Sequence, residues 1–162
     1  MIRNLMFSVM AILAVTLTFS VKAEGRSVRG EKTLGIMGGY GSYNHSGFAS
    51  VYFQYTFAPH FRIAPEVGCV FRNDNKSALV ISADMHFPFR VARGFNIYPL
   101  AGLTFNNWNY TGGDNILRVG GDFGAGLDLY FTQNFKLTVQ GKYSVMKDTS
   151  GAFAGIGFGY TF

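Results

Sequence analysis

The most constraining feature of this sequence is an alternation of bulky apolar with small or polar residues that recurs along most of its length. Almost no helical periodicity follows Lys32, and eight alternating segments of about ten residues succeed one another, each bounded by turn residues. The segments span residues 33–43, 48–57, 61–72, 78–89, 95–107, 117–131, 135–146 and 151–162. This period of two indicates β-strands with one apolar face and one polar face.

The connections between these segments are of two kinds, which alternate strictly along the chain. The compact connections lie at residues 58–60, 90–94 and 132–134. The more polar connections lie around Asn44, Asn73, Asn109 and Lys147. Each kind therefore occupies one end of the sheet, as in an up-and-down meander, and an even number of strands allows such a meander to close into a barrel.

The polar faces of the segments indicate which side of the barrel is inside. They are rich in glycine, tyrosine, threonine and serine, and poor in the lysine and glutamate that a water-exposed sheet would carry. In segment 48–57, for example, Tyr52, Gln54 and Thr56 oppose Val51 and Phe57. Small polar residues suit the narrow lumen of a small barrel, and the apolar face then points outward to lipid.

Phenylalanines flank all three compact connections, and by parity all of them belong to the apolar face: Phe57, Phe61, Phe89, Phe95, Phe131 and Phe135. A looser aromatic set lies toward the polar connections: Phe71, Phe105, Trp108, Tyr110 and Tyr143. Aromatic rings favour the membrane–water boundary, and no such boundary surrounds a soluble barrel. A ring of phenylalanine around one rim therefore indicates a membrane barrel. The sequence therefore predicts an all-β fold, an eight-stranded antiparallel up-and-down transmembrane β-barrel over residues 33–162.

The first 23 residues have the three-part pattern of a secretory signal. Arg3 precedes an apolar run, and Val21 and Ala23 occupy the small-residue positions of a signal-peptidase site. We expect cleavage after Ala23, which leaves residues 24–32 as a short polar segment before the barrel. The alternative is a retained membrane anchor, for which the apolar run is rather short.

Composition excludes several classes of function. Only 14% of the residues are charged, and the formal net charge of +5 is not gathered into a basic run, so we expect no nucleic-acid partner. The single cysteine, Cys69, cannot form an intrachain disulfide, and neither a CxxC nor an HExxH pattern occurs. No metal site and no cofactor are expected.

Charged residues also fall on the predicted lumen face, where burial without a partner would be costly. They are Arg62, Glu66, Arg72, Asp84, Asp122, Asp128, Lys136 and Lys142, with His86 beside them. A tight hairpin over Gln133 would place Tyr130 opposite Lys136, with Asp128 one diagonal step away. We expect a charge network that plugs the lumen; a gate, or a narrow path for protons or ions, is the alternative.

The last segment ends on an aromatic residue and resembles the assembly signal of bacterial outer-membrane proteins, through Ile156, Phe158, Tyr160 and Phe162. The pieces YPLAGLTF (98–105) and GAGLDLYF (124–131) resemble the fifth and sixth strands of the OmpA/OmpX-type barrel family. This resemblance implies an eight-stranded barrel in the outer membrane of a Gram-negative bacterium, surrounded by lipid and lipopolysaccharide and inserted by the barrel-assembly machinery. We expect a monomer.

The role predicted for such a barrel is structural or surface-interacting. Some barrels of this size are lipid-A-modifying enzymes, which would need a nucleophile and a base near the outer leaflet. The only candidates are His45 with Ser46 and Asp74 with Ser77, all in polar connections where such residues are common. We therefore predict no catalytic residues; a lipid-A-modifying hydrolase or acyltransferase and a secreted lipocalin-like barrel are the alternatives.

Overall fold

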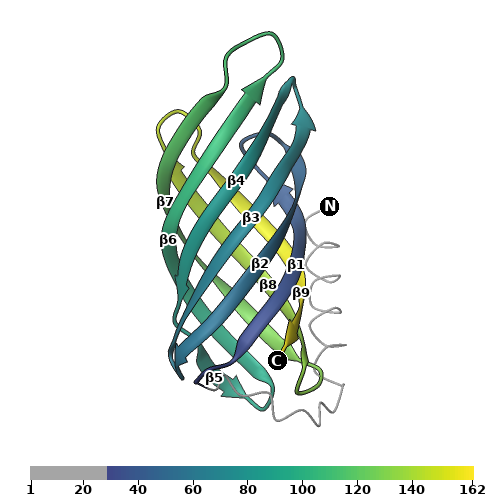
Figure 1. Cartoon of the computed structure of the whole chain (residues 1–162), viewed down its shortest axis with the longest axis vertical. Helices are drawn as coiled ribbons and strands as arrows, with labels where there is room; N and C mark the ends of the chain where they lie inside the picture. The colour runs from purple at the N-terminus through teal and green to yellow at the C-terminus, as the bar shows by residue number, and fades with distance from the viewer. Residues whose placement is uncertain (1–28) are drawn as a thin grey trace, which may run out of the picture.

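The computed structural model describes residues 29–162, and its strands form a single closed sheet (Figure 1). They are β1 (Lys32–Gly41), β2 (Ser46–Ala58), β3 (Phe61–Asn73), β4 (Lys76–His86), β5 (Phe89–Ala92), β6 (Phe95–Tyr110), β7 (Ile116–Tyr130), β8 (Phe135–Met146) and β9 (Gly151–Thr161). The predicted signal peptide, residues 1–23, lies outside the described residues, as do residues 24–28 of the predicted polar segment. Within residues 29–162, no helix has the length and apolar character needed to cross a membrane.

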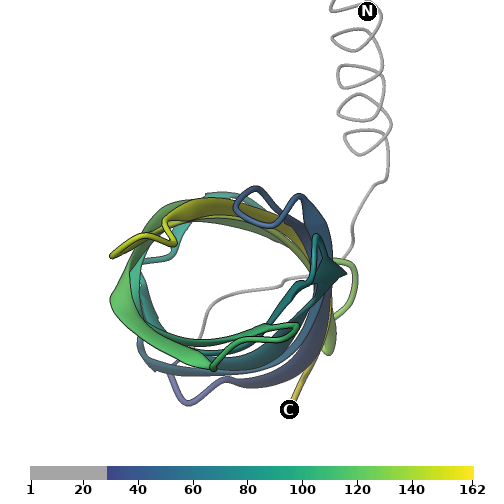
Figure 2. The same cartoon turned by 90° about the horizontal axis from the view of Figure 1, so that it is seen from above.

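The sheet closes because its first and last strands pair. β1 runs antiparallel to β9, from Thr33 opposite Thr161 to Gly41 opposite Phe153. All the other pairings join strands that follow one another in the chain, apart from the β4–β6 pairing around the short β5. Seen from above, the strands form a ring (Figure 2). The predicted antiparallel up-and-down barrel is confirmed, and it closes by pairing its last strand with its first.

β4 and β5 together form one strand of the barrel wall, so the barrel is eight-stranded. Both pair with β6, and β5 continues the line of β4 along it. Between them Pro88 has no N–H to donate to the sheet, although Phe87 N still donates to Pro99 O at 3.0 Å. The uninterrupted strand predicted over residues 78–89 is therefore corrected to a strand that ends at His86 and resumes at Phe89.

Large apolar side chains face outward, and small or polar side chains face the lumen. In β2, Val51 is 52% exposed, whereas Tyr52 is 3% and Gln54 is 2% exposed. In β9 burial alternates at every residue, and Ile156, Phe158 and Tyr160 are exposed while the glycines between them are buried. An apolar outer face with a polar interior is the reverse of a soluble barrel and matches a hydrocarbon surrounding.

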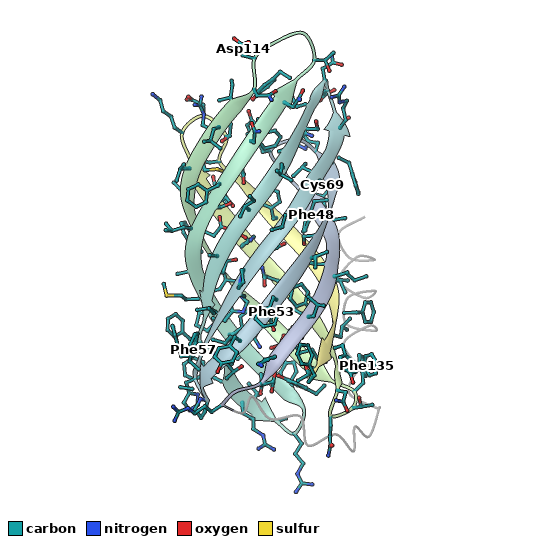
Figure 3. The ribbon with its side chains drawn as sticks, in the orientation of Figure 1. Phe48, Phe53, Phe57, Cys69, Asp114 and Phe135 are labelled. Carbon is teal, nitrogen blue, oxygen red and sulfur yellow. The ribbon has the colours of Figure 1, made fainter. Side chains whose placement is uncertain are left out.

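The connections gather at the two ends of the barrel, which we call the turn rim and the loop rim. The turn rim comprises residues 59–60, 93–94 and 131–134, and the loop rim comprises residues 42–45, 74–75, 111–115 and 147–150. In Figure 3 Asp114 marks the loop rim at the top, and Phe57 and Phe135 lie near the turn rim at the bottom. The last residue, Phe162, also lies at the turn rim, where its N–H donates to Lys32 O at 2.9 Å.

The six phenylalanines predicted to circle the turn rim all lie on the outer face of the barrel. Phe57, Phe89, Phe131 and Phe135 are exposed, and Phe61 and Phe95 are half-buried. Phe61 packs between neighbours, with its ring centroid 6.0 Å from that of Phe57 and 5.8 Å from that of Phe87. The structure thus places a band of phenylalanine around this end.

The looser aromatic set near the loop rim is only partly outside. Phe71, Phe105 and Tyr143 are exposed on the outer face, whereas Trp108 is 0% exposed and lies in the lumen. Its position follows the parity of Asn106, which is also buried, rather than that of Phe105. Tyr110, half-buried, packs against the same interior cluster. The prediction that Trp108 and Tyr110 belong to an outer aromatic set is therefore wrong.

Candidate functional site

In the half of the lumen toward the turn rim, the side chains are organised around a buried ion pair. Arg62 on β3 donates to Asp128 on β7 at 2.6 Å, and both side chains are fully buried. Thr138 on β8 donates to the other oxygen of Asp128 at 2.8 Å, and the Arg62 guanidinium lies 4.6 Å from the ring centre of Tyr98. Arg62 Nε also donates to His86 Nδ1 at 3.1 Å. These contacts cross the lumen and join strands from opposite walls.

A second group extends this layer toward the turn rim. Lys136 Nζ donates to Gln54 Oε1 at 2.5 Å and lies 3.8 Å from Glu31 Oε1, which in turn accepts from Tyr130 OH at 2.9 Å. The predicted hairpin register is confirmed, because Tyr130 lies opposite Lys136. From the sequence, Glu31 is predicted only as part of the short polar segment over residues 24–32. No periodicity marks it, and the sequence offered no signal for its entry into the lumen.

The middle of the lumen contains one cation surrounded by three acids. Lys142 Nζ lies 3.1 Å from carboxylate oxygens of Glu66, Asp84 and Asp122, and it donates to Ser82 Oγ at 3.2 Å. All three carboxylate side chains are at most 9% exposed. Because each acid comes from a different strand, Lys142 holds β3, β4 and β7 to β8 from the inside.

The structure places eight of the nine predicted lumen residues inside the barrel, and the exception is Arg72. The pairing between β3 and β4 shifts between Val70 and Asn73. This irregularity breaks the alternation near the end of β3, so both Phe71 and Arg72 are exposed. Arg72 is therefore exposed near the loop rim and does not enter the lumen. Period-two parity cannot foresee a bulge, which inserts an extra residue into one strand.

The lumen near the loop rim is filled by apolar side chains instead of charges. They form one packed cluster of Met37, Phe48, Tyr52, Val70, Ala78, Trp108 and Phe153. The ring of Phe153 lies 5.8 Å from that of Phe48, and the ring of Tyr43 lies 4.8 Å from that of Trp108, both edge to face. Each of these residues has the lumen parity of its strand, but alternation alone does not separate an apolar layer from a charged one.

Tyr43 covers this cluster at the loop rim. Its hydroxyl lies 3.4 Å from that of Tyr110, and Lys76 Nζ lies 5.4 Å from the centre of its ring. Burial and the hydrogen bond to Tyr110 raise the pKa of Tyr43 to about 12. The Tyr43 hydroxyl therefore stays protonated across the physiological pH range.

Small voids lie among the lumen side chains. One has a volume of about 20 Å³ and touches Phe48, Glu66 and Lys142, and another of about 10 Å³ is bounded by Tyr52 and His86 among others. A void needs roughly 10–15 Å³ to hold one water molecule. The two voids therefore have room for single waters rather than for an organic ligand.

Of the residues weighed as a nucleophile and a base, His45 and Ser46 are engaged in contacts that hold the first loop in place. Ser46 Oγ donates to Phe71 O at 2.7 Å, and His45 Nδ1 lies 3.0 Å from Tyr40 OH. The neighbouring Asn44 donates to the backbone carbonyls of Phe71 and Lys76, both at 3.0 Å. These contacts tie the first loop to the second. No hydrogen bond joins Ser46 to His45 within residues 29–162.

The family to which this architecture corresponds is identified by sequence as well as by shape. The family described as outer membrane protein beta-barrel domain matches residues 11–162. This protein is an outer-membrane β-barrel. The match spans the whole described barrel and thereby confirms the resemblance to small outer-membrane barrels. It also supports a place in the bacterial outer membrane.

Solved structures share this fold at low sequence identity. The N-terminal β-barrel domain of Pseudomonas aeruginosa OprF is 21% identical, with a TM-score of 0.72, and the match covers 83% of this chain and 98% of that one. Neisserial surface protein A is 16% identical (TM-score 0.67, covering 82% and 97%). Ail, the attachment invasion locus protein of Yersinia pestis, is also 16% identical (TM-score 0.62, covering 83% and 100%). No curated protein matches this sequence.

Proposed function

We propose that this protein is a monomeric structural or surface-interaction barrel of the Gram-negative outer membrane, with a lumen closed to solutes. In this proposal residues 1–23 direct export and are removed, and the barrel-assembly machinery inserts the chain among phospholipid and lipopolysaccharide. The turn rim faces the periplasm and the loop rim faces outward. The protein is not an enzyme and binds no cofactor.

The observation that carries the proposal is the double filling of the lumen. Charged side chains that pair across the barrel fill the half near the turn rim, and the packed apolar cluster fills the half near the loop rim. Water or an ion crossing the barrel would have to displace Arg62 from Asp128 and then pass Trp108. Each of these three residues is 0% exposed. Breaking a buried pair leaves an uncompensated charge, which is strongly unfavourable.

Conductance across a planar lipid bilayer tests the closed lumen. We expect the refolded barrel to insert without producing a large, stable conductance, whereas a wide-pore porin measured in parallel produces one. Large stable channels from the pure protein would contradict the closed lumen. A gate, or a narrow path through the charged layer, would instead show small and brief openings.

The enzymatic alternative has a separate test. The contacts of Ser46 and His45 support a role in joining the loops, so a His45→Ala, Ser46→Ala double variant should leave the mass spectrum of lipid A unchanged in cells that produce it. A change in lipid A that depends on the wild-type chain and disappears in the variant would establish a lipid-modifying enzyme.

A further inference from the structure

The exposed charges of the described residues are divided unequally between the two rims. Every exposed carboxylate side chain lies near the loop rim: Asp74, Asp114 and Asp148. Near the turn rim the exposed charged side chains are all cationic: Arg29, Lys32, Arg90 and Arg93. The carboxylate of Glu31 is only 8% exposed and is directed into the lumen, toward Lys136. The turn rim therefore presents positive charge without an exposed carboxylate side chain to compensate it.

Arg90 and Arg93 stand on a hairpin that extends past the barrel wall. β5 pairs with β6 alone, and all four of its residues are exposed. In the described part of the chain, no strand pairs with the edge of β5 that faces away from β6. The barrel wall on that side ends at the turn between β2 and β3, where His60 Nδ1 lies 2.9 Å from Pro88 O. Among the described residues, neither guanidinium forms an ion pair. Both arginines are thus free to meet a ligand outside the barrel.

The position of this hairpin relative to the phenylalanine band gives its depth. Phe89, half exposed, immediately precedes Arg90, and Phe95 follows Arg93 by two residues. If the phenylalanine rings lie at the membrane–water boundary, the backbone of Arg90 stands one residue beyond it, about 3.3 Å along the tilted strand. Its side chain starts from the face of β5 opposite to Phe89, at the open end of the barrel. Arginine can keep its aliphatic stem against apolar surface while its charged end reaches the headgroups. This depth corresponds to the layer of lipid phosphates.

We propose that Arg90 and Arg93 bind the phosphate groups of anionic phospholipids in the leaflet next to the turn rim. This inference rests on the proposed membrane location. A guanidinium presents a planar fork of N–H donors that matches phosphate oxygens, and no carboxylate side chain competes for it here. Phosphatidylglycerol has a net negative charge, whereas the ammonium group of phosphatidylethanolamine compensates its phosphate. The rim should therefore select phosphatidylglycerol.

Mass spectrometry of barrels released from mixed vesicles tests this selection. We would refold the full barrel in equal phosphatidylglycerol and phosphatidylethanolamine, release it under mild conditions and compare the two lipids that remain bound. The wild type should retain an excess of phosphatidylglycerol. We expect the Arg90→Ala, Arg93→Ala variant to reduce that excess by about fivefold for each arginine, which corresponds to about 1 kcal/mol per cation at an anionic surface.

A matched control removes two exposed cations from the other end. Arg72→Ala, Lys147→Ala changes the net charge equally, but Asp74 and Asp148 stand within two residues of these positions, so the control should retain the excess. Equal loss in both variants, or a wild type without lipid preference, would overturn the proposed site. So would binding of the soluble polyanion sucrose octasulfate to the same arginines without a lipid preference.

Membrane insertion is read independently of the lipid preference. A folded barrel migrates faster than the boiled chain in a gel, so each sample shows whether the protein has inserted. Insertion without a preference for phosphatidylglycerol rejects only the arginine site. Failure of the wild type to insert into any vesicle rejects the proposed function, and the arginine site with it.

Discussion

Single charged residues inside this barrel link strands that are far apart in the sequence. Arg62 and Asp128 are 66 residues apart, and Lys142 lies 76 residues from Glu66. In the barrel interior the attraction between such charges is less screened than at a surface. The free-energy cost of leaving one of them without a partner is correspondingly larger. The stability of the barrel should therefore depend strongly on a few buried cations.

Lys142 provides the sharpest test at this scale. Lys142→Met removes the ammonium group that lies 3.1 Å from each of three carboxylates. Because these acids would remain buried together, we expect a loss of about 3–5 kcal/mol in the free energy of unfolding. Urea titration followed by the fluorescence of Trp108, which is buried in the lumen, measures this loss.

The matched control for Lys142 is Lys147→Met, which removes an equal charge from an exposed position at the loop rim. It should change the free energy of unfolding by no more than about 0.5 kcal/mol, as is usual for surface substitutions. If both variants were equally stable, the charge network would not contribute to the stability of the barrel.

At the scale of elements, the decisive contact is the seam between β1 and β9. Gly39 and Gly155 lie opposite each other in this pair. A Cβ on Gly39 would collide with Ala154 O and approach Gly155 Cα at 2.6 Å. These are backbone atoms, which cannot move aside without opening the seam. Glycine is therefore required there by the close approach of the two strands.

Gly39→Ala should accordingly hinder closure of the barrel. We expect a loss of about 1–3 kcal/mol, the usual cost of overpacking, and a smaller folded fraction in a heat-modifiability gel. Gly141→Ala on β8 is the control, because a Cβ there has no atom within 4 Å. Equal folded fractions for the two variants would show that the seam tolerates a methyl group.

The end of β9 makes a second prediction for an element. Phe162 is 61% exposed and stacks on Tyr160 with ring centroids 6.3 Å apart, whereas Thr161 faces the lumen and contacts Thr33 Oγ1 at 2.9 Å. Since the resemblance to outer-membrane proteins implies that the assembly machinery reads the last aromatic residue, Phe162→Lys should reduce assembly in cells more than Thr161→Lys. The amount of folded barrel in the outer-membrane fraction measures this, and equal amounts would contradict a terminal signal.

For the whole molecule, the apolar outer face and the polar interior indicate that the barrel is surrounded by lipid and not by water. Residues such as Ile36, Leu103 and Leu117 are 59–63% exposed on the outer face, while the paired charges around Arg62 and Lys142 lie inside. Monomeric soluble proteins rarely expose apolar patches larger than a few hundred Å². Hydrocarbon also requires every backbone N–H and C=O to find a partner within the protein, and only closure of the sheet provides this.

Cell fractionation tests this conclusion at the same scale. We expect the protein in the membrane fraction, soluble only with detergent and heat-modifiable in gels. Recovery of folded protein from the periplasm without detergent would contradict the membrane barrel and favour the secreted lipocalin-like alternative. A soluble maltose-binding protein followed in the same cells controls for leakage between fractions.

The sequence by itself determined the strand number, the identity of the outer face and the end at which the phenylalanines gather. All of these follow from period-two alternation and from turn residues, which are local properties of each strand. Only the tertiary structure decided the proline break before Phe89, the outward position of Arg72 and the buried position of Glu31. It also determined which charges meet, because the stagger of the strands sets the neighbours across the lumen. That is why the outward position of Phe162 could be predicted from the sequence, whereas the position of Lys142 among three carboxylates could not.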